Sequence, residues 1–197
     1  HGLGAAVMAT LAVGAYRHAR RFNLGLEELY AAMDAAVATQ FTADHFATAQ
    51  MALLEVRSGR LQWVNAGHPS PLLIRQHRVL ASLDSPTTLP VGFGGAVPVV
   101  SERALERGDR VLFFTDGVVE EHRDGGEQFG EARLIDFVER ASREGGAVQE
   151  VVHRLSRDLM RQRGGVTTDD ATLLLLEWRG GSVDQLANVE EALTTAS

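Results

Sequence analysis

The predicted helices and strands of this 197-residue chain occur in blocks, and this order limits the folds that are open to it. Residues 3–37 predict two helices, and residues 46–115 predict a series of short strands. Apolar positions within 134–138 and 148–159 mark two further helices, and 172–178 predict a last buried strand. A parallel sheet would require regular alternation of strand and helix, so the block order predicts an α+β fold.

The two predicted N-terminal helices differ in their apolar pattern. Residues 3–16 are small and apolar on nearly every face, which predicts a helix buried against a sheet. A second helix is predicted after Asn23, and its apolar residues recur at helical intervals. Its buried face is expected to contain Leu26, Leu29, Tyr30, Met33 and Val37. Its solvent face is expected to contain Glu27, Glu28 and Asp34.

Short apolar runs separated by turn residues predict an antiparallel meander in the middle of the chain. The runs are 46–56, 61–65, 72–74, 79–83, 97–105 and 110–115. Residues 57–60 predict a hairpin connection. The prolines within 68–71 interrupt the hydrogen-bonded ladder because proline has no N–H to donate. Residues 84–96 contain two prolines and three glycines and predict a loop.

Composition excludes several classes of partner. A formal net charge of −7 gives no attraction to nucleic acid or to an anionic membrane, and we expect neither as a partner. The local cluster of Arg17, Arg20 and Arg21 is interpreted as a solvated helix C-terminus. No apolar run reaches the roughly 20 residues of a membrane span. The absence of cysteine is consistent with a reducing compartment, so we expect a cytoplasmic protein.

Two strand ends carry carboxylates. The apolar run 111–114 leads to Asp116-Gly117, which places Asp116 at the C-terminal end of a core strand. Asp-Gly is also a common turn dipeptide, so a turn role and a ligand role are both open for Asp116 on this signal alone. Asp169-Asp170 stands just before the apolar run 173–176, where the pair either binds a hard divalent cation or caps a solvated turn.

The sequence lacks the motifs that several other reaction types require. The seven histidines have no zinc-site spacing, and there is no cysteine to complete one. A Walker-type glycine loop and a Gly-x-Ser-x-Gly elbow are also absent from the sequence. The remaining chemistry is hydrolysis assisted by oxygen-ligated metals, in which two ions about 3.5 to 4 Å apart activate a shared water.

Seven motifs, taken in order, resemble the metal-dependent type 2C (PPM) serine/threonine protein phosphatases, in particular the bacterial SpoIIE-like branch. From the first motif to the last, they span nearly residues 1–179. The motifs are His1-Gly2 before Ala5-Ala6, residues 46–48, residues 63–73, residues 89–92, residues 108–120, Phe129-Gly130 before Leu134, and residues 169–173.

The resemblance implies a fold and a reaction. It implies an α-β-β-α sandwich, in which two antiparallel sheets are flanked by helix pairs, over residues 1–179, followed by a polar tail at 180–197. It further implies a centre of two Mn²⁺ or Mg²⁺ ions and hydrolysis of phosphoserine or phosphothreonine on a protein. The expected substrate is a phosphorylated anti-sigma factor antagonist, in bacterial stress or developmental signalling. A homodimer is left open.

The resemblance also assigns residues. Asp116 and Asp169 match the two downstream metal-binding aspartates of the family, and Glu120 falls where relatives can place a ligand for a third metal. Asn65 and His68 belong to a motif typical of the branch. They either stabilise the turn before the prolines or contact the substrate. His1 is not assigned a catalytic role.

The start of the chain departs from the family pattern. Relatives have a bridging aspartate a few residues before the position of His1, and they have N-terminal strands that this chain lacks. We therefore expect at least one ligand upstream of residue 1, and we expect residues 1–197 alone to bind Mn²⁺ poorly and to turn over negligibly. A catalytically inactive scaffold module of the same fold is the main alternative, and a hydrolase of small phosphoesters is a weaker one.

Overall fold

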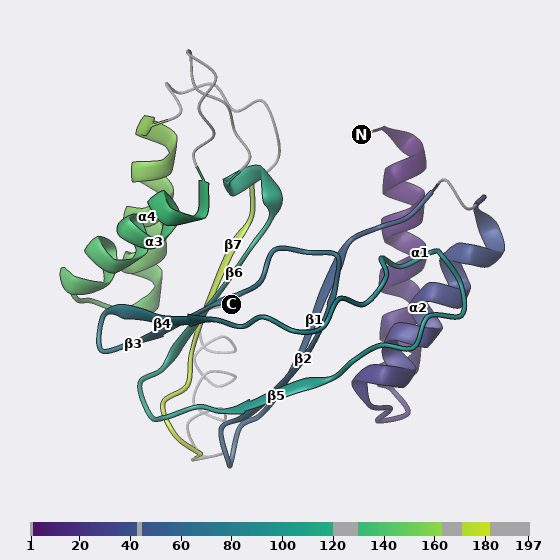
Figure 1. The fold of residues 1–197 in the computed structure, drawn as a ribbon, viewed down its shortest axis with the longest axis horizontal. Helices are drawn as coiled ribbons and strands as arrows, with labels where there is room; N and C mark the ends of the chain where they lie inside the picture. The colour runs from purple at the N-terminus through teal and green to yellow at the C-terminus, as the bar shows by residue number, and fades with distance from the viewer. Residues whose placement is uncertain (1, 43–44, 120–129, 163–170, 182–197) are drawn as a thin grey trace, which may run out of the picture. The chain divides into compact units, whose positions relative to one another are not determined.

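The computed structural model describes residues 2–42, 45–119, 130–162 and 171–181. Within these ranges the chain forms four α-helices, one short 3₁₀ helix and seven strands, and it divides into two compact units (Figure 1). Unit 1 comprises His1–Leu54, Leu61–Ser70 and Asp84–Arg103. Unit 2 comprises Glu55–Arg60, Pro71–Leu83 and Ala104–Ser197. Each unit contributes one helix pair and one sheet, which confirms the α+β class with two antiparallel sheets.

Unit 1 is built from a helix pair and a three-stranded sheet. Its helices are α1, Leu3–Arg20, and α2, Leu26–Gln40. Its strands are β1, Ala49–Glu55, β2, Arg60–Ala66, and β5, Ser101–Ala104, in the order β1-β2-β5. Its core joins side chains of both helices to β1, β2 and the 84–96 loop. The members from the sheet and the loop are Met51, Val64, Ala66 and Val91.

The first helix was predicted to be buried against a sheet, and it is less buried than predicted. In α1 only Met8, Ala12 and Ala19 are buried, and Leu3 and Val13 are exposed. The buried positions lie on a narrow stripe, so α1 packs on one side. Alanine and glycine bury little apolar area wherever they face, and their abundance is therefore a weak signal for burial.

Helix α2 confirms its predicted buried face and corrects one polar position. The five apolar residues predicted to be buried are all in the core. Asp34 was expected to face solvent, but it is 3 % exposed. Its carboxylate accepts hydrogen bonds from the N–H groups of Gly92 (2.8 Å) and Gly94 (3.1 Å). These bonds replace hydration, which is why a carboxylate can be buried here.

Tyr30 also links α2 to the 84–96 loop. Its hydroxyl donates to the carbonyl of Leu89 (2.8 Å), and the side chain is fully buried. Burial, together with the nearby charge of Asp34, raises the pKa of Tyr30 to about 12. The phenol is therefore held neutral where an exposed tyrosine would ionise.

This raised pKa predicts a pH dependence of stability. An unfolded tyrosine ionises near pH 10, so the stability contributed by neutral Tyr30 is complete below about pH 10 and is lost as pH rises toward about 12. Tyr30→Phe should be less stable than wild type at neutral pH, because it lacks the bond to Leu89. The difference should shrink between pH 10 and 12 in urea unfolding, and parallel curves for the two proteins would contradict the assignment.

Unit 2 is a four-stranded sheet with a helix pair on one face. The strands are β3, Leu72–Arg75, β4, Arg78–Ser82, β6, Arg110–Phe114, and β7, Leu173–Glu177, in the antiparallel order β4-β3-β6-β7. The helices are α3, Gly130–Arg143, and α4, Val148–Gln162. Both are amphipathic, and their apolar faces join Leu112, Phe114 and Leu175 in one core.

The predicted meander is corrected by the way the strands are distributed. β1 pairs with β2, and β3 pairs with β4, but β2 and β3 belong to different sheets. The segment that contains Pro69 and Pro71 separates the two hairpins, since proline cannot continue a ladder. The last strand is also less buried than predicted. It lies at a sheet edge, and Leu174 is 60 % exposed.

Trp178 closes the end of β7 within unit 2. Its indole N–H donates to the carbonyl of Val56 (2.8 Å), and its ring covers Gly59. Gly59 has a φ of +75°, and a Cβ added there would lie 2.7 Å from the indole ring. A Cβ added at Gly181 would overlap the carbonyl oxygen of Arg57. The polar tail at 180–197 stays a prediction, since residues 182–197 lie outside the described part.

Gly59→Ala should lower the free energy of unfolding by about 2 kcal/mol, because alanine is strained at positive φ and because its Cβ displaces the indole. Urea unfolding followed by tryptophan fluorescence measures the loss. Gly108→Ala is the matched control, since Gly108 has a φ of +92° but no atom within 4 Å of the added Cβ. Equal losses in the two variants would show that the contact with Trp178 contributes nothing.

Candidate metal centre

Asp116 lies just beyond the C-terminal end of β6. Thr115 is extended, and the chain then turns into the 3₁₀ helix η1, Asp116–Val118. The side-chain Oδ1 of Asp116 accepts the N–H of Gly117 (2.8 Å), and the N–H of Val119 donates to the Asp116 carbonyl (2.8 Å). Gly117 and Val118 are buried while Asp116 is exposed. The turn thus presents a carboxylate to solvent from a buried support.

Thr115 couples this turn to the start of β7. In the β6–β7 register Phe114 pairs with Leu173, so the strand that follows Asp169 in the sequence begins beside the Asp116 turn. The Thr115 hydroxyl accepts the N–H of Thr172 (2.9 Å), and the Thr115 N–H donates to the Thr172 carbonyl (3.2 Å). Sequence reasoning did not single out Thr115. A hydroxyl residue directly before Asp-Gly at a strand end was the available signal.

The two other predicted ligands, Asp169 and Glu120, lie outside the described residues. Within the described ranges, no group of three His, Cys, Asp or Glu side chains is placed to hold a metal. Asp116 by itself fits a hard divalent cation, because it is an exposed carboxylate held by a backbone N–H. The described part therefore supplies one carboxylate toward such a site.

Asn65 and His68 lie in unit 1, at the end of β2. The Asn65 side chain donates to the His68 carbonyl and accepts the His68 N–H, both at 2.7 Å. Gly67 between them has a φ of +74°, and the His68 Nδ1 is 3.1 Å from the Thr48 hydroxyl. Both polar atoms of the Asn65 amide stabilise the turn. This is the first of the two roles considered for Asn65, the other being contact with the substrate.

Solved structures of the same fold are type 2C phosphatase domains. The RsbU and RsbW domains of Rv1364c from Mycobacterium tuberculosis match at 25% identity and a TM-score of 0.71, covering 99% of this chain and 56% of that one. The phosphatase domain, with a fragment of the regulatory domain, of SpoIIE from Bacillus subtilis matches at 14% identity and a TM-score of 0.73, covering 90% and 51%. The present chain thus spans about half the length of these two.

A third solved structure is the catalytic domain of the serine/threonine phosphatase PstP in complex with two manganese ions. It matches at 19% identity and a TM-score of 0.60, covering 87% of this chain and 80% of that one. The helix pairs and antiparallel sheets therefore define a phosphatase fold of the type 2C class. Residues 1–179 match the model of stage II sporulation protein E, and the chain belongs to this SpoIIE family.

None of the helices in the described residues is both long and apolar enough to cross a lipid bilayer. The separate expectation that the acidic surface does not bind an anionic membrane stays a prediction.

Proposed function

We propose that the full-length protein that contains this chain carries out metal-dependent hydrolysis of phosphoserine or phosphothreonine on a protein. The observation that carries the proposal is the position of Asp116 in a chain that matches its family over residues 1–179. A carboxylate at the end of a central strand, on a rigid turn, is suited to hold a cation in a fixed place. When bound, a pair of divalent ions supplies the Lewis acidity that lowers the pKa of a water.

Asp116 and Asp169 are the proposed ligands of two Mn²⁺ or Mg²⁺ ions. Three peptide units join Asp169 to Thr172, which is hydrogen-bonded to Thr115. PstP, of the same fold class, binds two manganese ions, which supports manganese as the first metal to test. Glu120 is proposed as a ligand of a third ion.

The proposed substrate is a phosphorylated anti-sigma factor antagonist. The support is the membership of the SpoIIE family and the resemblance of this chain to an RsbU domain that occurs with an RsbW domain in one protein. Contact of Asn65 and His68 with that substrate stays a prediction.

The test is phosphate release by the full-length protein, with Mn²⁺ and with EDTA. The substrates are p-nitrophenyl phosphate and phosphorylated candidate antagonists. We expect release that requires Mn²⁺ and a kcat/KM that is higher for a phosphoprotein than for p-nitrophenyl phosphate. Turnover that continues in EDTA would contradict the proposed metal dependence. Preference for the small ester would favour the alternative of a small-phosphoester hydrolase, and no turnover at saturating Mn²⁺ would favour a scaffold.

A further inference from the structure

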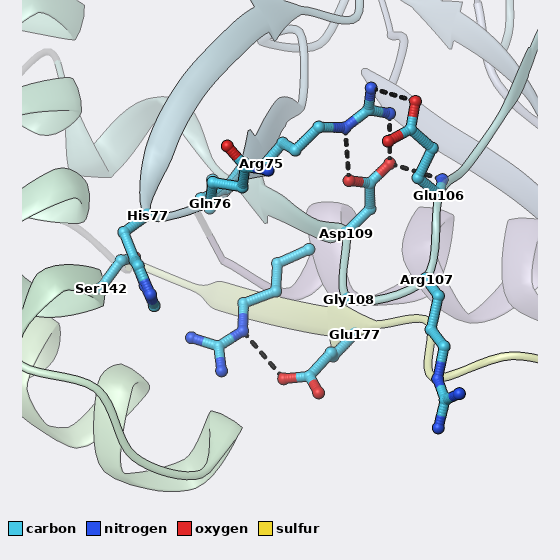
Figure 2. Close-up of a pocket in the computed structure, with 11 residues that line it drawn as sticks. Arg75, Gln76, His77, Glu106, Arg107, Gly108, Asp109, Ser142 and Glu177 are labelled. Atoms are coloured by element: carbon cyan, nitrogen blue, oxygen red, sulfur yellow. Dashed lines mark hydrogen bonds and ion pairs between the residues drawn. The ribbon is translucent and has the colours of Figure 1, made fainter.

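A cavity of about 340 Å³ lies in unit 2 at the N-terminal end of β6 (Figure 2). It is lined by the β3–β4 turn at 75–77, by residues 106–110 before and at the start of β6, by Ser142 of α3 and by Glu177 of β7. Four separate parts of the chain therefore meet around one hollow. Asp116 lies beyond the other end of β6, and the strand between these ends spans about 13 Å.

The carboxylates around this cavity are already paired. Asp109 is 1 % exposed, and its two oxygens each lie 2.8 Å from a nitrogen of Arg75. Glu177 accepts from Arg110 and from Arg179, each at 2.8 Å. Burial raises the pKa of Glu177, but hydrogen bonds from Arg179 and Arg110 outweigh burial and keep its pKa below the usual value. Glu177 is therefore ionised, and both acids are paired with arginines.

The local charge is positive although the whole chain is acidic. An adjoining hollow shares Arg107, Gly108 and Glu177 with the cavity and adds Arg179. Around the two hollows, four arginines face three carboxylates, which leaves a formal charge of +1 before His77 is counted. The arginines are Arg75, Arg107, Arg110 and Arg179, and the carboxylates are Glu106, Asp109 and Glu177.

Two buried donors at this cavity have no partner among the described residues. Ser142 is 0 % exposed, and its hydroxyl makes no hydrogen bond there. The guanidinium of Arg110 uses Nε for Glu177 and Nη2 for the Gly146 carbonyl (3.2 Å), but its buried Nη1 has no acceptor. An unsatisfied buried donor is costly, and a charged one most of all, so rotation of these two side chains toward an acceptor in the cavity would be favoured.

The rim of the cavity is held in an uncommon conformation. Gln76 and His77 have φ values of +49° and +66°, a region that residues other than glycine rarely adopt. Both residues are exposed and line the cavity. The tight β3–β4 turn therefore keeps an imidazole and an amide at the entrance, where they can add hydrogen bonds to a bound group.

We propose that this cavity is a binding site for a small oxyanion of the phosphate type, held by the Arg110 guanidinium and the Ser142 hydroxyl. An oxyanion offers several acceptor oxygens to the two unsatisfied donors, and its charge balances the local positive excess. The site is separate from the proposed metal centre and goes beyond the proposed function. Its ligand is either inorganic phosphate in solution or the phosphoryl group of a phosphoprotein, because both present the same chemistry.

The test is thermal unfolding of the full-length protein in EDTA at constant ionic strength, with sodium phosphate or sodium chloride. EDTA removes metal ions, so phosphate cannot act through the centre at Asp116. At about ten times its Kd, phosphate should raise Tm by about 3 to 5 °C. A phosphoserine peptide in place of phosphate distinguishes the two sources of ligand.

Ser142→Ala provides the decisive variant. Its Tm without phosphate should equal or exceed that of wild type, because it removes an unsatisfied buried hydroxyl. The rise in Tm with phosphate should be lost. Ser85→Ala is the matched control, since the Ser85 hydroxyl is also buried without a partner among the described residues but Ser85 does not line the cavity. This control should keep the full rise.

Three results would overturn the proposal. The first is the absence of any phosphate-dependent rise in the wild type, with phosphate or with the peptide. The second is a full rise in Ser142→Ala, which would place the anion elsewhere. The third is a lower Tm of Ser142→Ala without phosphate, which would show that a buried water already satisfies the hydroxyl.

Discussion

Asp116→Asn is expected to reduce Mn²⁺-dependent phosphate release by about 100-fold or more. Loss of a charged ligand weakens the binding of a divalent cation and disturbs the geometry in which the cation is held. The fold should persist. Asparagine keeps an Oδ1 that can accept the N–H of Gly117, and residue 116 is exposed. Steady-state turnover with Mn²⁺, together with circular dichroism, measures both effects. Asp169→Asn should lose activity to a similar extent.

Asp136→Asn is the matched control for this prediction. Asp136 is an exposed aspartate on α3 of the same unit, so the substitution makes the same change of charge away from the Asp116 turn. Its turnover should stay at the wild-type level. Near-normal activity of Asp116→Asn at saturating Mn²⁺ would remove Asp116 from the metal centre.

Asp109→Asn should lower the free energy of unfolding by about 2 to 3 kcal/mol, because it leaves the Arg75 guanidinium without its buried counter-charge. The value is at the low end for a buried pair, since the Arg75 side chain is 24% exposed and also contacts Glu106. Asp109 further accepts the N–H of Glu106 (2.8 Å), which fixes the loop before β6. Urea unfolding at neutral pH and moderate salt measures the change.

Glu106→Gln tests whether burial is what makes an ion pair with Arg75 stabilising. Glu106 contacts the same arginine, at 2.5 Å, but its side chain is 69% exposed. Exposed ion pairs contribute little to stability because water and salt screen them. Glu106→Gln should therefore change the unfolding free energy far less than Asp109→Asn. Equal losses would show that the pair with Asp109 gains nothing from its burial.

Local patterns predicted most elements because they depend on residues that are close in sequence. The helical spacing of Leu26, Leu29 and Val37 identified the buried face of α2. The apolar run before Thr115 identified β6 as a strand between two neighbours. What local patterns could not predict is pairing between distant segments. The division of the strands into two sheets depends on partners such as β3 with β6, and no local pattern encodes that choice.

Polar residues show the same limit more sharply. Asp34 matched a solvent face by its chemistry, and only the approach of the Gly92 and Gly94 N–H groups made its burial favourable. The position of Asp116 just after a core strand could be predicted because a strand, a carboxylate and a glycine are adjacent in the sequence. Ser142 and Arg110 could not be associated before the fold brought α3 and β6 to one cavity.

The most direct test of the central claim, that Asp116 is a metal ligand, is a calorimetric titration of the full-length protein with Mn²⁺. We predict that wild type and Asp136→Asn bind Mn²⁺ with the same affinity, and that Asp116→Asn binds more weakly by about tenfold or more. Equal Mn²⁺ affinity for Asp116→Asn and wild type would contradict the account.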